Sequence, residues 1–174
     1  MIITDKNEAV KQILNQQVVA IFQNSSEYGP RGLGNRSLLF DPRNKNGKDI
    51  VNKIKKREWF RPFAGTVLLE HAHEWFDMGT IKESPYMSYA IPVKEEKKSI
   101  IPAITHVDGT CRVQTVTKEQ NKKFYEIIKL FHEKTNVPIL FNTSFNLAGE
   151  TLVETKQDAI NTLNISEINY LYIP

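Results

Sequence analysis

Residues 55–63 combine four cationic side chains with three aromatic rings in the sequence Lys-Lys-Arg-Glu-Trp-Phe-Arg-Pro-Phe. A solvated surface helix rarely carries such aromatic residues, and a buried strand rarely carries such cations. We therefore expect the aromatic residues, Trp59 among them, to anchor the segment while Lys55 and Arg61 point toward one place. Fixed cations that converge usually hold an anion, most often phosphate or carboxylate. Alternatively, the cations lie outside a buried aromatic cluster, with their stems along its surface.

A second cationic stretch, residues 28–37, reads Tyr-Gly-Pro-Arg-Gly-Leu-Gly-Asn-Arg-Ser and follows an expected buried strand. Its glycines allow backbone N–H groups to approach a ligand closely, and Arg31 and Arg36 add bidentate donors. The stretch matches neither the Walker A loop nor the dinucleotide-binding fingerprint. A tight surface turn with ion-paired arginines is the alternative. We expect this loop and residues 55–63 to meet at one phosphate-bearing ligand.

Polar side chains also occur on or directly after two expected strands. Arg112 lies on an otherwise apolar, alternating strand, where the turn before the strand does not explain it. Four hydrogen-bonding residues follow the apolar run 137–141, at the strand end where an open α/β sheet places its ligand crevice. Helix capping or an Asx turn is the alternative. These four residues are Asn142, Thr143, Ser144 and Asn146.

The pair His71 and His73, next to Glu74, raises the question of a metal site. Residues two apart do not share a face of a helix, and no third ligand stands at a suitable spacing. We therefore expect packing or surface histidines and no metal centre.

Hydrophobic spacing predicts the elements that position these residues. Residues 118–134 give the clearest helix, because Phe124, Ile127, Ile128 and Phe131 recur at helical spacing. Strands mixed with helices predict an α/β fold, in which helices pack on a sheet. Further helices are expected from Asp5 or Asn7 to Leu14 and at 49–56, 71–76 and 155–163, and strands at 18–22, 65–69, 87–93, 110–116, 137–141 and 170–173.

Length and composition narrow the class of protein. The 174 residues suit a single domain, which we place at 1–174. The composition, with 40% hydrophobic and 25% charged residues, is that of a globular protein, and neither a membrane-spanning segment nor a signal peptide is evident. A net charge of +3 is too weak to indicate a nucleic-acid partner. The single cysteine, Cys111, excludes an internal disulfide and fits a reducing, cytoplasmic setting.

Seven short motifs occur in order along the chain. They are Tyr-Gly-Pro-Arg-Gly-Leu-Gly-Asn-Arg-Ser at 28–37, Asp-Pro-Arg at 41–43, Arg-Glu-Trp-Phe-Arg-Pro-Phe at 57–63, Ser-Pro-Tyr-Met at 84–87, Thr-His-Val-Asp-Gly-Thr at 105–110, Arg-Val-Gln-Thr at 112–115 and Asn-Thr-Ser-Phe-Asn at 142–146. In this order they resemble the C-terminal domain of the nodulation and antibiotic O-carbamoyltransferases. The resemblance covers the chain from about Val18 onward, and no single motif would suffice for it.

The resemblance implies a YrdC-like twisted mixed sheet with flanking helices, similar to the threonylcarbamoyl-AMP synthases. It implies an enzyme that takes carbamoyl phosphate and ATP, with Mg²⁺, and forms carbamoyl-adenylate with release of pyrophosphate. Joining two polyanions needs cations that cancel their repulsion. By the same resemblance, the reaction site is lined by Lys55, Arg61, Arg112, Asn142 and Ser144, with Arg31 or Arg36 from the first loop.

The chain departs from the family pattern in two respects. The family's N-terminal domain, which binds iron and passes the carbamoyl group to a hydroxyl, is not expected within this chain, because the resemblance begins close to Met1. Three alternatives stay open: the chain works with a separately encoded partner of that type, it is a fragment, or it has lost the transfer reaction. In the first case we expect that partner, or a second copy of this chain, to dock near Arg31. The second departure is that the family usually has alanine where Gly32 stands and a proline near Gly65, but neither change removes a proposed ligand.

Two functions therefore stay open. The first is a carbamoyl-adenylate-forming enzyme, the donor half of an O-carbamoyltransferase. The second is a non-catalytic module that binds a nucleotide or an acyl phosphate and regulates or completes a partner. Carbamoyl-phosphate-dependent exchange of pyrophosphate into ATP distinguishes the two.

Overall fold

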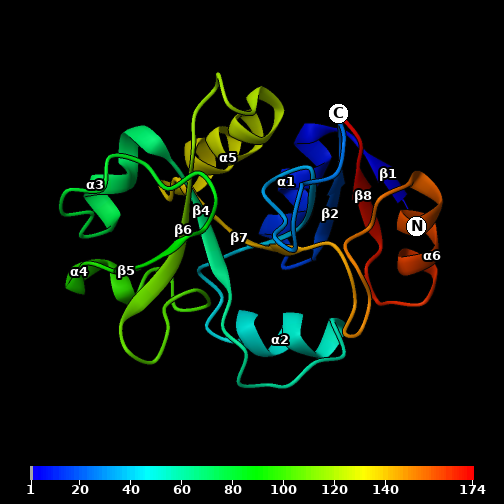
Figure 1. Cartoon of the computed structure of the whole chain (residues 1–174), viewed down its shortest axis with the longest axis horizontal. Coiled ribbons are helices and arrows are strands. Elements are labelled where there is room, and N and C mark those ends of the chain that lie inside the picture. The colour runs from blue at the N-terminus through cyan, green and yellow to red at the C-terminus, as the bar shows by residue number, and fades with distance from the viewer. Residues whose placement is uncertain (1) are drawn as a thin grey trace.

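The computed structural model describes residues 2–174, which form one mixed sheet of eight strands with helices packed around it (Figure 1). The strand order is β1-β8-β2-β3-β7-β4-β6-β5. The strands are β1 (Ile2–Thr4), β2 (Val19–Phe22), β3 (Arg36–Phe40), β4 (Ala64–Leu68), β5 (Tyr89–Pro92), β6 (Thr110–Val116), β7 (Ile139–Ser144) and β8 (Tyr170–Tyr172). The helices are α1 (Lys6–Leu14), α2 (Gly47–Ile54), a 3-10 turn (Leu69–His71), α3 (Ala72–Trp75), α4 (Glu95–Lys98), α5 (Lys122–Thr135) and α6 (Lys156–Asn164). The expected α/β class is confirmed.

The sheet is mixed, because it contains both parallel and antiparallel pairs of strands. The pairs β1–β8, β8–β2 and β4–β6 are parallel, whereas β2–β3, β3–β7, β7–β4 and β5–β6 are antiparallel. In Figure 1, helices α1 and α5 lie on the opposite side of the view from α2. None of the helices in residues 2–174 combines the length and the apolar character needed to cross a bilayer.

The longest helix, α5, follows the predicted spacing, although it begins four residues later than expected. Asn121 sets the start, because its side chain accepts a hydrogen bond from the backbone N–H of Phe124 at 3.1 Å. Asn136 ends the helix in the left-handed region, with φ of 59°. The four apolar residues that predicted the helix are all buried.

Strand β3 was not predicted, and its position makes it important. It pairs with β2 on one side and with β7 on the other, and all five of its residues are buried. Its first two residues, Arg36 and Ser37, look like the end of a polar loop in the sequence. Strand β1 and the short helix α4 were not predicted either.

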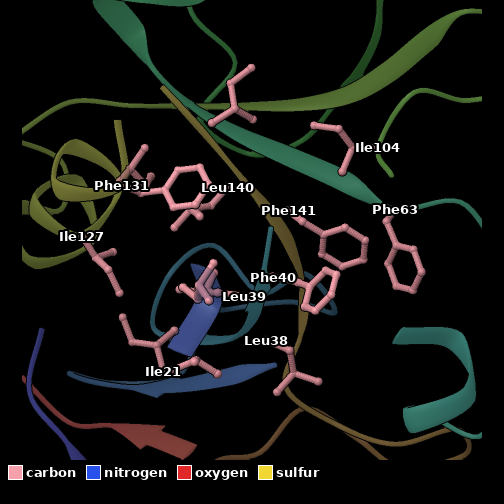
Figure 2. Packing of buried hydrophobic residues seen from close by; sticks show 14 of the residues in the cluster. Ile21, Leu38, Leu39, Phe40, Phe63, Ile104, Ile127, Phe131, Leu140 and Phe141 are labelled. Atoms are coloured by element: carbon pink, nitrogen blue, oxygen red, sulfur yellow. The ribbon is translucent and has the colours of Figure 1, made fainter. Parts of the chain in front are cut away.

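Aromatic packing under the sheet supports the centre of the fold. Figure 2 shows Phe141 of β7 between Phe40 and Phe63. The ring of Phe141 lies 6.0 Å from that of Phe40, edge to face, and 4.4 Å from that of Phe63. Phe63 is 4% exposed, so one aromatic residue of segment 55–63 is part of the core.

The expectation that Trp59 and Phe60 also anchor this segment is wrong. Their exposed fractions are 72% and 62%. The loop is held through its backbone instead, because the buried Asn52 side chain donates to the carbonyls of Trp59 and Arg61 at 3.1 and 3.0 Å. Asn52 on α2 therefore holds the loop in place, as the rings of Trp59 and Phe60 were expected to do.

Candidate functional site

The strand register of β7, β4 and β6 creates a hollow on one face of the sheet. Asn142 on β7 pairs with Ala64 on β4, and Ala64 pairs with Arg112 on β6. Side chains of directly paired residues point to the same face of a sheet. The small methyl group of Ala64 therefore leaves space between the longer side chains of Asn142 and Arg112, and all three residues line one cavity.

This cavity has a volume of about 90 Å³, small beside the roughly 300–1,000 Å³ of most ligand pockets. It suits a phosphate-sized or carbamoyl-sized group better than a whole nucleotide. Its lining includes three arginines but no aspartate or glutamate. The lining residues are Pro30, Arg31, Gly32, Arg57, Pro62, Phe63, Ala64, Met87, His106, Arg112, Asn142, Thr143 and Ser144.

The three guanidinium groups come from separate parts of the chain. Burial and then the charge of Arg112 lower the pKa of Arg31, which places these two cations within reach of each other. Burial and then the charge of Arg61 lower the pKa of Arg57 to about 10, so Arg57 stays protonated at neutral pH. Partly desolvated like charges are stabilised when an anion binds between them.

The side chain of Arg57 is held in place by a hydrogen bond to Asn52 and by the aromatic ring of Phe63. Its Nε donates to Asn52 Oδ1 at 2.6 Å, and its guanidinium carbon lies 4.1 Å from the ring centroid of Phe63. This stacking and hydrogen bond fix the direction of the side chain. The cavity therefore has at least one arginine that is positioned before any ligand arrives.

Behind the cavity, Asn142 belongs to a buried network of polar side chains. Its Nδ2 donates to Thr66 Oγ1 at 2.9 Å, and it lies 3.1 Å from both Gln114 Oε1 and the carbonyl oxygen of Gly32. Gln114 Nε2 in turn donates to the carbonyl oxygen of Leu33 at 2.9 Å. The loop before β3 and three strands of the sheet are thereby joined.

Gly32 is required by this close approach. A Cβ atom at this position would overlap the carbonyl oxygen of Arg36 and would lie 2.9 Å from both Ser144 Cα and Ser37 Oγ. The absence of a side chain at Gly32 therefore allows the loop to lie against β7.

The backbone amides of the glycine-rich loop are occupied by a carboxylate of the chain itself. Glu27 Oε1 accepts hydrogen bonds from the N–H groups of Leu33, Asn35 and Arg36 at 2.7, 2.8 and 3.3 Å. These amides do not line the cavity, contrary to the expectation that they approach a ligand. The loop instead contributes the side chain of Arg31.

Lys55 lies outside the cavity lining, with an exposed fraction of 2%. Its Nζ donates to the carbonyl oxygen of Ser144 at 2.5 Å and to the carbonyl oxygen and Oδ1 of Asn146 at 2.7 and 3.0 Å. Burial and then the charge of Arg57 lower the pKa of Lys55 to about 7. Lys55 therefore ties the end of α2 to the end of β7, where Thr143 and Ser144 line the cavity and Asn146 does not.

The other two predicted arginines also lie outside the lining. Arg61 is half exposed, and its Nε donates to Glu58 Oε2 at 2.8 Å. Arg36 is 2% exposed, and its guanidinium carbon lies 3.6 Å from the ring centroid of Phe22. Its two terminal nitrogens donate to the carbonyl oxygens of Gln23, Asn24, Asn35 and Glu154. Arg36 thus joins β3 to two neighbouring segments.

Eight of the thirteen lining residues were not among the predicted site residues, and Arg57, His106 and Met87 are three of them. Arg57 belongs to the cationic segment, but the sequence favoured its neighbours Lys55 and Arg61. His106 Nε2 lies 2.8 Å from the carbonyl oxygen of Phe63, which requires a hydrogen on that nitrogen. Met87 has φ of 57°, a left-handed conformation that non-glycine residues rarely adopt and that the sequence does not reveal.

The two histidines considered for a metal site lie outside this cavity lining. His71 packs against His132, with ring centroids 4.6 Å apart, and its Nδ1 lies 3.5 Å from Glu74 Oε2, whereas His73 is exposed. Within residues 2–174, no group of three or more His, Cys, Asp or Glu side chains is placed to hold a metal ion.

A solved structure shares this fold. The crystal structure of full-length HypF in the phosphate- and nucleotide-bound form matches 96% of this chain and 24% of its own chain, with a TM-score of 0.65 and 19% sequence identity. This likeness supports the expected YrdC-like α/β class. At this level of identity it carries the fold alone.

Sequence relatives are closer. Nodulation protein NolNO of Sinorhizobium fredii is 44% identical over 169 residues, which are 96% of this chain and 25% of the relative. The 3'-hydroxymethylcephem-O-carbamoyltransferase of Streptomyces clavuligerus is 35% identical over 157 residues, 90% of this chain and 29% of the relative. The chain thus spans between about a quarter and a third of the length of these relatives. The model of the carbamoyltransferase C-terminus matches residues 10–174. The chain therefore belongs to the carbamoyltransferase C-terminal domain family.

Proposed function

We propose that this domain binds carbamoyl phosphate and ATP and forms carbamoyl-adenylate, the donor half-reaction of an O-carbamoyltransferase. The observation that carries the proposal is the cavity in which Arg31, Arg57 and Arg112 converge without an acidic residue in the lining. Membership of the carbamoyltransferase family and the O-carbamoyltransferase name of one relative supply the group that is transferred.

The cavity suits the phosphate end of an acyl phosphate. Three guanidinium groups give more donors than one neutral ligand needs, and each forms charge-assisted bonds with phosphate oxygens. The small volume of about 90 Å³ leaves the bulk of a nucleotide outside the cavity mouth. ATP with Mg²⁺ would therefore place its phosphates near the exposed Arg31, and the ion would neutralise part of their charge.

The reaction balances when one water molecule is consumed. Water releases inorganic phosphate from carbamoyl phosphate and leaves carbamate. An oxygen of carbamate then attacks the α-phosphorus of ATP, the bond to the β-phosphate breaks, and pyrophosphate leaves. The products are carbamoyl-adenylate, phosphate and pyrophosphate. Arg31, Arg57 and Arg112 would hold the anions in place and offset the negative charge that gathers as the reactants approach.

Transfer of the carbamoyl group would require a further protein part. The relatives are three to four times longer than their matching region, and we propose that an N-terminal-type carbamoyltransferase domain or subunit takes the adenylate and delivers the group to a hydroxyl. A second copy of this chain is the alternative partner.

Exchange of labelled pyrophosphate into ATP tests the adenylation step. The expected result is exchange that depends on this chain, on Mg²⁺ and on carbamoyl phosphate, because carbamoyl-adenylate and pyrophosphate can re-form ATP. Binding of ATP and carbamoyl phosphate without exchange would favour the non-catalytic module. No binding of either compound would refute both functions.

A further inference from the structure

Two surface segments of the chain carry opposite charge. Residues 45–61, the basic segment, contain seven cationic and two acidic side chains, a net charge of +5. Residues 150–167, the acidic segment, contain one cationic and four acidic side chains, a net charge of −3. The remaining residues are nearly balanced, because the whole chain carries +3. Such a local separation of charge indicates a surface that meets a charged partner.

The basic segment presents cations and aromatic rings together. Lys53 and Lys56 are exposed. Trp59 and Phe60 are exposed as well, with ring centroids 6.0 Å apart, and Lys48 Nζ lies 5.6 Å from the centroid of the Trp59 ring. Adjacent exposed aromatic residues, unlike single ones, mark an interaction surface, and tryptophan is enriched among the residues that dominate binding energy. None of these five side chains lines the arginine cavity.

The acidic segment forms a groove of about 280 Å³. Its lining includes the exposed Glu150, Glu154 and Asp158 and, among the described residues, no lysine or arginine. Ile165 also lines the groove and is 56% exposed, so apolar surface lies beside the carboxylates. A surface that combines aromatic rings with ammonium groups is complementary to such a groove in both respects.

The two segments adjoin in the folded chain. Lys56 Nζ donates to the carbonyl oxygen of Ile165 at 3.2 Å, and the backbone N–H of Ala148 donates to the carbonyl oxygen of Lys55 at 2.9 Å. In Figure 1 the loop that precedes α6 passes the C-terminal end of α2. When a second copy is turned by half a rotation, each basic segment meets the acidic segment of the other copy, so the attraction occurs twice.

We propose that the basic and acidic segments form a two-fold interface through which two copies of this chain pair. A nucleic acid or an anionic lipid surface would be attracted by the basic segment but repelled by its acidic neighbour, whereas a second copy matches both. A standard interface buries about 800 Å² of each partner, roughly a tenth of the 8630 Å² that this chain exposes. The two segments make up about a fifth of the chain, which is sufficient for that area. This inference does not depend on the proposed function.

Sedimentation equilibrium of the full chain, over a range of concentrations at low ionic strength, tests the inference. We expect a monomer–dimer equilibrium that shifts toward the monomer as salt is added, because salt screens the attraction between exposed charges. Trp59→Ala should raise the dissociation constant of the dimer roughly 30-fold, as the loss of an interface anchor does, without changing the unfolding of the monomer. A chain that stays monomeric at every concentration in low salt overturns the proposal. Assemblies that grow beyond two copies also overturn it, because they indicate head-to-tail contacts.

Charge reversal on each segment identifies the contact. Lys53→Glu and Glu154→Lys should each raise the dissociation constant about tenfold, because each places like charges opposite one another in both halves of the interface. An equimolar mixture of the two variants should restore pairing, since one half of the mixed dimer is unchanged and the other half has both charges reversed. Lys123→Glu is the matched control, because Lys123 is an exposed lysine of α5 outside both segments. It should dimerise as the unmodified chain does.

The remaining outcomes also decide. Dimers that Trp59→Ala and both charge reversals leave unchanged overturn the assignment of this surface, and so does a mixture that pairs no better than its components. If a variant does not fold, the concentration and salt dependence of the unmodified chain still decides. These measurements contain no carbamoyl phosphate, so their failure leaves the proposed function standing, and the pyrophosphate exchange assay tests that function separately.

Discussion

Replacing Arg57 with glutamine removes one of the three guanidinium groups that line the cavity, while keeping a polar side chain of moderate length. The sequence favoured Arg61 as the anion-binding cation of this segment. The structure favours Arg57, because Arg57 lines the cavity and Arg61 forms an exposed pair with Glu58. The two arginines are four residues apart, so each variant serves as a control for the other.

The size of the effect follows from the contacts of Arg57. Loss of one charge-assisted hydrogen bond to phosphate is worth roughly 1.5–3 kcal/mol, which weakens binding about 10- to 150-fold. The substitution also leaves the buried Oδ1 of Asn52 without its donor at 2.6 Å, which costs about 1–3 kcal/mol of folding stability. Arg61→Gln removes only an exposed ion pair, which contributes little to folding stability because water screens it.

Calorimetric titration with carbamoyl phosphate at low ionic strength measures the first effect, and thermal unfolding measures the second. Arg57→Lys adds a test of geometry, because lysine keeps the charge but loses the planar fork. Since burial and the charge of Arg61 lower the Arg57 pKa to about 10, binding should be constant near neutral pH and weaken as the pH approaches 10. Should Arg61→Gln weaken binding more than Arg57→Gln does, the assignment of the cavity cations is refuted.

Three further predictions concern the framework around the site. Burial and then the charge of Arg57 lower the pKa of Lys55 to about 7, so above pH 7 the unfolded chain keeps a proton on Lys55 that the native chain releases. The free energy of unfolding, measured relative to Lys55→Met, should therefore rise by about 2 kcal/mol between pH 7 and pH 9. A difference between the two proteins in urea unfolding that stays constant across this range would contradict the prediction. Gly32→Ala should destabilise the fold by roughly 1–3 kcal/mol because its Cβ would meet Ser144 Cα at 2.9 Å, and unchanged thermal unfolding would show that the loop can move away. Trp59→Ala should change the free energy of unfolding by less than about 0.5 kcal/mol, since the indole is 72% exposed. A large loss of stability in a denaturant titration would show instead that the indole packs in the core.

Elements with a strong hydrophobic period could be predicted from the sequence. Helix α5 and strand β6 were found because their apolar residues repeat at the spacing of one face. Strand β3 was missed because the sequence gives no sign that four backbone carbonyls would enclose the guanidinium group of Arg36. In the sequence, a buried arginine such as Arg36 looks like a loop residue, because most of the carbonyl groups that accept its hydrogen bonds lie in other segments of the chain.

The candidate site was predicted in part for a related reason. The sequence indicated Arg31, Arg112 and the Asn142 region, since each stands out from its local pattern. It could not rank Arg57 against Arg61, because that choice depends on Asn52, whose hydrogen bonds fold the loop and aim one arginine inward. Which side chain of a mixed segment turns inward is decided by tertiary contacts.

The position of β8 in the sheet affects how this domain would emerge from the ribosome. Strand β8 (Tyr170–Tyr172) lies between β1 and β2 and is parallel to both. The ribosome synthesises β1 and β2 well before β8, so neither can form this pairing until β8 has emerged. Until then β2 exposes one unpaired edge, and such edges are the sites at which nascent chains pair wrongly or aggregate. The pairing of Ile2 with Tyr170 also joins residues far apart in the sequence, which slows folding. Chaperone binding to nascent chains that lack α6 and β8, released once these segments are complete, is the expected signature of this order of assembly.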